Sequence, residues 1–374
     1  MRRRRSRRLG PPRPQLLATA LVVVAARLAA PAPAAADDSG LFSGQVTIGY
    51  RSVGIGGREA KYREDYDLQD GPRLFDLDFQ FTPAPKLRAF ADRVGLELTN
   101  FGGDFFESLH LGVRKFNTFN FRLDHTRSSY FYDDRLIPPE RLEVELYNGG
   151  DFHRFDFDRV RNAARLNVDV NDRAKVNFGF EHSTKLGSST TTLDVERDEF
   201  QLDRSIDESF DAYHGGFQYS WSRVTLVLLE EVRDYANAVT LFLPGFSEGE
   251  APPPGNGALD FYFLNQPYDS TSRQHTVRIL AHPTARLSIR LRASRQNLDL
   301  DAAADERQQG LTEARQPFSA TAEGRGTISR DVDLYDLDLD YRLTRRFTLT
   351  GGLYRRKLDQ QGDFDFGGAL NLGF

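Results

Sequence analysis

The chain of 374 residues contains no cysteine, and methionine and tryptophan occur once each. Without cysteine there are no disulfides, no thiolate metal sites and no haem attached through a Cys-x-x-Cys-His motif. Small secreted domains often depend on disulfides, so a secreted chain without them needs another source of stability. Good helix-forming stretches are scarce after the first forty residues, and no later segment has the length and apolarity of a transmembrane helix.

Signals of enzymes and of nucleic-acid-binding proteins are also scarce. None of the seven histidines has metal-ligand spacing, and no glycine-rich phosphate loop opens a helix. His214 and Ser220 are six residues apart, roughly 20 Å along a strand, which is too far for a nucleophile–base pair. The mature chain has no basic stripe for nucleic acid. We therefore expect no enzyme activity, no metal, no cofactor and no nucleic-acid partner.

The N-terminus has the pattern of a secretion signal. Arg2 to Arg8 form a basic region, Leu16 to Ala30 an apolar region interrupted by Arg27, and Ala34 and Ala36 a cleavage site. About fifteen apolar residues are too few to span a hydrocarbon core of roughly 30 Å. The sequence predicts a cleaved signal peptide at 1–36 and a single domain at 37–374.

The mature chain alternates apolar and polar residues with the period of β-strands. Phe75, Leu77, Phe79 and Phe81 share one face of such a segment, and the intervening residues are polar. The polar face is strongly charged along whole strands, and the apolar face carries aromatic residues at its ends. That combination is typical of a barrel with lipid outside and water inside, whereas simple alternation also occurs in soluble sandwiches.

The spacing of the strands favours an up-and-down barrel. We expect about 14 strands, with 12–16 compatible with the pattern, near 41–52, 73–82, 92–101, 105–114, 118–131, 155–170, 174–184, 211–222, 223–235, 272–282, 286–298, 331–342, 346–357 and 364–374. Every second connection is short. The others are often long and polar, at 53–72, 132–154, 185–210, 236–271 and 299–330, with short ones at 102–104 and 358–363. The fold class predicted is all-β: a closed antiparallel transmembrane up-and-down β-barrel with short periplasmic turns and long extracellular loops. An even strand count would place both termini on the periplasmic side.

The last segment, FDFGGALNLGF, has its apolar residues on one face and stops on a phenylalanine. This resembles the C-terminal signature of bacterial outer-membrane proteins, and the resemblance implies recognition by the barrel-assembly machinery and a location in the outer membrane, in contact with its lipid. The residues of this expected assembly signal are Phe364, Phe366, Leu370, Leu372 and Phe374.

A second resemblance covers only short stretches. The segments KYREDYDLQDG (61–71), NVDVNDRAKVNF (167–178) and RILAHPTARLSI (278–289) resemble those of MtrB/PioB-type barrels. That resemblance implies a barrel that holds a periplasmic multihaem cytochrome. Members of that family are much longer, and their N-terminal cysteine pair is missing here.

The charged face is the expected functional surface, because in a barrel it would line the lumen. Its candidate lumen and selectivity residues are Asp76, Asp78, Arg122, Asp124, Arg165, Asp169, Glu181, Arg278, Arg290, Arg292, Asp336, Asp338 and Asp340. These charges would tune which solutes pass a constriction, or form cross-strand ion pairs that fix strand register. The favoured function is a porin-like channel for passive passage of small polar or ionic solutes. The alternatives are the cytochrome-holding barrel and a barrel enzyme. The pattern specifies no oligomeric state.

Overall fold

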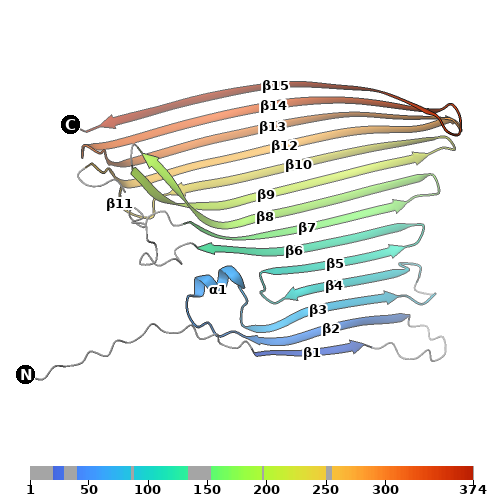
Figure 1. Cartoon of the computed structure of the whole chain (residues 1–374), viewed down its shortest axis with the longest axis horizontal. Helices are drawn as coiled ribbons and strands as arrows, with labels where there is room; N and C mark the ends of the chain where they lie inside the picture. Colours follow the sequence, from blue (N-terminus) through green and yellow to red (C-terminus); the bar gives the residue numbers. More distant parts are fainter. Residues whose placement is uncertain are drawn as a thin grey trace, which may run out of the picture.

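The computed structural model describes residues 20–28, 40–85, 88–133, 153–195, 198–249 and 255–373, with the backbone alone for 20–28. Nearly all of this is one antiparallel sheet in which fourteen strands follow one another in chain order, while the short β11 pairs only with β12 (Figure 1). The predicted all-β, up-and-down architecture is confirmed. The strands are β1 (Ala20–Leu28), β2 (Leu41–Ser52), β3 (Gly71–Thr82), β4 (Arg93–Phe101), β5 (Phe106–Lys115), β6 (Phe119–Asp133), β7 (Arg154–Asp169), β8 (Ala174–Val195), β9 (Asp198–Ser220), β10 (Val224–Phe242), β11 (Ser247–Glu248), β12 (Ala258–Thr284), β13 (Leu287–Leu311), β14 (Pro317–Arg342) and β15 (Thr348–Leu372).

The predicted short turns that follow β3, β5, β7, β9, β12 and β14 lie at one rim of the sheet, on the right in Figure 1, whereas the short connection at 102–104 lies at the opposite rim. The connection between β5 and β6 is three residues long and places Asn117 at a positive φ of 56°, a conformation that asparagine tolerates better than most residues. Between β7 and β8, the side chain of Asn171 accepts hydrogen bonds from two backbone N–H groups. We call this edge the short-turn rim and the opposite edge the long rim.

Three predicted loops are strands instead. Most of 185–210, 236–271 and 299–330 extends the hairpins β8–β9, β10–β12 and β13–β14 beyond their predicted ends. Strands β8 to β15 therefore project far past the short strands β4 and β5 (Figure 1). The backbone pairing continues because the alternation continues, although with a different distribution of polarity described below.

The predicted turn at 358–363 is also wrong, since β15 is a single strand paired with β14 without a register shift. The sheet path has fourteen strands, as predicted, but they are not the same fourteen. β15 replaces two expected strands, and β1, which lies within the expected signal peptide, is an additional one. As a consequence, the end of β15 lies at the long rim, opposite the short turns (Figure 1).

A short helix, α1 (Glu59–Asp65), occupies the connection predicted as a loop at 53–72. An exposed Lys61–Asp65 pair joins side chains one turn apart, at 2.8 Å. The helix packs against β6, where the Arg63 guanidinium lies 3.9 Å from the centre of the Phe131 ring. Arg63 also pairs with Asp156 of β7 at 3.3 Å. The helix thereby ties the β2–β3 connection to the projecting ends of β6 and β7.

Beside α1, a buried ionic cluster joins the ends of β2 and β3 to the β4–β5 connection. Arg51 donates a hydrogen bond to Asp104 at 3.1 Å, and Arg73 lies 3.4 Å from the same carboxylate. Phe75 lies under Arg51, 5.5 Å from its guanidinium. The register shift between Thr47 and Ile48 falls opposite this position. Phe75 therefore lies at a bulge instead of continuing the regular alternation of the following residues.

Candidate functional site

Near the short-turn rim, the register aligns apolar side chains on one face of thirteen consecutive strands, β2 to β15. On β14 the series is Tyr335, Leu337, Leu339 and Tyr341, with Leu291 and Leu353 directly opposite Leu337 on the neighbouring strands. We call this surface the apolar belt. Its other members include Phe42, Val46, Leu77, Phe79, Phe81, Val94, Leu96, Leu98, Leu109, Leu111, Val113, Phe119, Phe121, Leu123, Leu166, Val168, Val176, Phe178, Phe180, Tyr213, Phe217, Tyr219, Leu226, Leu228, Val277, Ile279, Leu287, Ile289 and Leu349.

The apolar belt is not covered by any other part of the described chain. Phe178, Tyr213 and Tyr335 are 55%, 51% and 52% exposed. Contiguous exposed apolar surface of this extent is rare on soluble monomers and marks contact with a membrane or another apolar partner.

All thirteen predicted lumen residues lie on the opposite face of the sheet, at the level of the belt or directly beside it. Several take part in ion pairs. Arg290 lies 3.5 Å from Asp338 and 3.0 Å from Asp340. Asp124 accepts a hydrogen bond from Arg122 at 2.7 Å and contacts His110 at 2.6 Å. These contacts favour a structural contribution of the charges to register.

Other members of the set take part in different arrangements. Glu181 is bound by both arms of Arg161 at 2.7 Å, and Asp169 lies 3.1 Å from Lys175. Arg161 and Lys175 were missed by the sequence reasoning, although both alternate in phase with predicted members. Arg292 stands opposite Asp336 in register, yet its Nε has no hydrogen-bond partner. The remaining members, placed on this face by register, are Asp76, Asp78, Arg165 and Arg278.

Towards the long rim, the two faces exchange polarity. The belt face becomes polar, and one row there crosses nine strands: His125, Asn162, His182, Asp211, Asp234, Thr271, Asp299, Ser329 and Gln361. Four of the eight neighbouring pairs in this row are hydrogen-bonded, for example Thr271 to Asp234 at 2.8 Å and Ser329 to Asp299 at 2.9 Å. The charged face becomes apolar at the same level.

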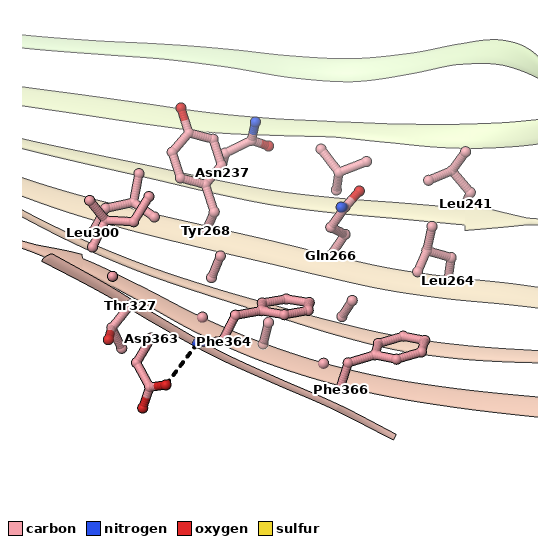
Figure 2. Close-up of a pocket in the computed structure, with 18 of the residues that line it drawn as sticks. Asn237, Leu241, Leu264, Gln266, Tyr268, Leu300, Thr327, Asp363, Phe364 and Phe366 are labelled. Carbon is pink, nitrogen blue, oxygen red and sulfur yellow. Dashed lines mark hydrogen bonds between the residues drawn. The ribbon is translucent and has the colours of Figure 1, made fainter. Parts of the chain in front are cut away.

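This apolar zone surrounds a cavity of about 1050 Å³ (Figure 2). Its lining comes from seven strands, from β8 to β15. Seven strands spaced ~4.8 Å apart can line one cavity only if the sheet curves around it. The charged face is therefore the concave face, and the belt face is convex. Closer to the long rim, Phe200, Leu202, Leu259 and Tyr262 form a buried apolar cluster.

The described residues of the expected assembly signal contribute to this concave zone. Phe364 and Phe366 point into the cavity with their rings stacked, centroids 6.3 Å apart (Figure 2). They lie across from Gly326 and Gly324, where the absence of side chains leaves room for the rings. Leu370 and Leu372 line a neighbouring cavity. The four side chains therefore lie on the concave face, not on the belt face, while Phe374 lies outside the described residues. Their role as an assembly signal stays a prediction.

Apolar side chains make up most of the cavity lining, and the polar ones are Thr191, Arg204, Asn237, Gln266, Tyr268, Thr327, Gln360 and Asp363. Two of these have an unpartnered buried atom, the Arg204 Nε and the Asn237 Oδ1. The nearest glutamate along β9, Glu208, is already paired with Lys185 at 3.1 Å. Arg204 thus adds an unpaired positive charge to a mostly apolar surface.

Within the described ranges, no three His, Cys, Asp or Glu side chains gather as a metal site would require. No helix of the described part is long and apolar enough to cross a membrane. No protein-family model matches the chain, and no curated protein is significantly similar to it. What is established is thus a class, a single curved up-and-down antiparallel sheet with one apolar belt and a charged concave face.

Proposed function

We propose that this protein is an outer-membrane β-barrel channel through which small polar or ionic solutes pass. The observation that carries the proposal is the alignment of the apolar belt and the charged concave face at the same level of thirteen strands. On β14 the belt extends from Tyr335 to Tyr341, roughly 20 Å along the strand. With the tyrosine side chains at both ends, it approaches the apolar band of ~25 Å that outer-membrane barrels present to lipid.

If the apolar belt contacts lipid, the sheet must also close into a barrel. Unpaired backbone N–H and C=O groups cost several kcal/mol each in hydrocarbon, so a free strand edge is excluded from lipid. Among the described strands, β15 has only β14 as a neighbour, and no described strand pairs with its second edge. Because strands alternate in direction along the path, β15 runs parallel to β2 and antiparallel to β1. Cleavage of the predicted signal peptide would remove β1, and β2 and β15 would then close the barrel as a parallel pair.

The lumen at belt level is lined by both signs of charge, which suits ions and small polar solutes and not apolar ones. Arg290 and the two carboxylates that it contacts lie on adjacent strands and place opposite charges side by side across the concave face. A passing solute would therefore find both a cationic and an anionic group on this part of the surface.

The test is ion conductance of the purified full chain in planar bilayers. Discrete conductance steps that scale with salt concentration are expected. A chain that inserts into the bilayer but never conducts would refute the channel. If that silent chain also retained a multihaem cytochrome during purification, the cytochrome-holding function would replace it.

A further inference from the structure

The concave apolar zone has no part in passing small ions, because ions are poorly solvated by such a surface. Along β12, the cavity extends from Leu264 past Tyr268, and on the neighbouring β13 it reaches Leu300. The corresponding length is roughly 20 Å along the strands. Its volume of about 1050 Å³ lies just above the range of small-ligand sites, ~300–1,000 Å³. This shape fits an elongated apolar group better than a compact one.

A single cation marks one end of the cavity. Arg204 lies in one row with Leu241 and Leu264, towards the long rim. It makes no ion pair with any described residue, and its buried Nε lacks a partner. The carboxylate in the same row, Glu306, is three strands away, about 14 Å across the sheet. A guanidinium with an unpartnered Nε beside apolar surface favours an anionic oxygen group, and Arg–carboxylate pairs often form two parallel hydrogen bonds.

We propose that this cavity binds a single-chain amphiphile with a terminal carboxylate, such as a long-chain fatty acid. The carboxylate binds Arg204, and the hydrocarbon chain extends past Tyr268 towards Leu300 and Ile328. Phe364 and Phe366 form the β15 side of the groove, and Ala302, Gly324 and Gly326 keep it open. The site lies nearer the long rim than the charged residues of the concave face, so it is separate from the proposed path of polar solutes. It rests on the proposed function only in treating the concave face as the lumen.

The experiment uses the full chain in lipid nanodiscs and palmitate carrying a photoreactive diazirine in its chain. After irradiation, mass spectrometry is expected to find cross-links on β10, β12 and β15 at the cavity, displaced by excess unlabelled palmitate. Arg204→Gln should weaken palmitate binding roughly ten- to a hundredfold, the factor that a hydrogen bond to a charged group contributes. Hexadecanol, which lacks the charge, should compete equally well in both proteins.

Two control variants separate charge from packing. Arg325→Gln removes a charge at the same level but on the convex face, and should leave palmitate binding unchanged. Ala302→Phe fills the cavity and should weaken both palmitate and hexadecanol. The site is refuted if palmitate cross-links only to the apolar belt, or if Arg204→Gln binds palmitate as tightly as the unaltered chain while still folded by circular dichroism. Ion conductance of the same preparations does not depend on palmitate binding, so the palmitate site and the channel are tested separately.

Discussion

An arginine substituted on the convex face tests most directly whether the apolar belt contacts lipid and the polar row contacts water. Leu337 lies in the middle of the apolar belt on β14, between Leu291 and Leu353 in register. Ser329 lies on the same strand and the same face, eight residues nearer the long rim, in the polar row. If the belt contacts lipid and the row contacts water, arginine at these two positions should have very different consequences.

The expected loss of unfolding free energy depends on how deep each position lies in the bilayer. Arginine on the lipid face of a barrel costs ~2–4 kcal/mol at the bilayer midplane and ~0–1 kcal/mol near the interfaces. Leu337→Arg also loses its contacts with two leucines, at ~0.2–1 kcal/mol per cross-strand pair. We therefore expect a loss of about 2–6 kcal/mol. Ser329→Arg should change stability by less than ~0.5 kcal/mol, because the new guanidinium stands beside Asp299.

The assay is reversible guanidinium unfolding of the full chain in lipid vesicles, followed by tryptophan fluorescence of Trp221 and by circular dichroism. Tyr341→Arg, at the belt edge towards the short turns, supplies a third depth and should fall between the other two. Equal free energies of unfolding for Leu337→Arg and Ser329→Arg would refute the assignment of the belt to lipid.

Three other predictions address the lumen, the helix and closure. Replacing Arg290 and Arg292 by Ser should shift reversal potentials in a salt gradient towards cation selectivity, because Asp338 and Asp340 lose their counter-charge; unchanged selectivity would leave these arginines a role in register alone. Arg63→Ala should destabilise the α1 region by about 1–2 kcal/mol in hydrogen exchange, since it removes both an ion pair and a cation–π contact, whereas Lys61→Ala, on the exposed side, should change it by less than ~0.5 kcal/mol. Spin labels on Ser43 of β2 and Thr350 of β15, introduced as cysteines into a chain that has none, should lie within about 20 Å of each other in a closed barrel, while a flat sheet of the same strands would separate them by more than twice that distance.

The belt half of the fold could be predicted from sequence because its polarity pattern is simple. Each strand there alternates regularly, and the turns are marked by residues such as Asn117 and Asn171. Periodicity therefore gave the strands, the short turns and the common face of all thirteen charged residues. It could not give the specific ion pairs, since whether Asp124 meets Arg122, His110 or both depends on side-chain rotamers.

The projecting half could not be read in the same way. Its strands alternate, but serine, threonine, alanine and aspartate occupy many positions, as in the SSTTT run of β8 and the DAAADE run of β13. Such composition is typical of loops. Pairing partners on both sides satisfy the backbone there, and those partners are distant in sequence. The cation of the cavity, Arg204, was missed for the same reason, because its row consists of residues from different hairpins.

In β15 the apolar residues change from the convex to the concave face, and in the sequence this change resembles a turn between two strands. Its apolar residues are odd-numbered near the short turns, at Leu349 and Leu353, and even-numbered near the long rim, at Phe364 and Phe366. In a strand with one constant environment, such a change of phase requires a turn or a bulge. Here the strand is continuous and the environment changes, so the apolar side chains move from the convex to the concave face.

The position of that change can be located on the sheet. Directly beyond the belt, one row of the convex face holds Glu230, His275, Arg295, Asp333 and Lys357 on five adjacent strands. Glu230 contacts His275, and Arg295 lies 4.0 Å from Asp333. Ionisable groups on a lipid-facing surface are costly inside the hydrocarbon and acceptable at its edge. If the belt contacts lipid, this row marks the membrane boundary, and everything nearer the long rim, including the cavity with Arg204, stands clear of the bilayer.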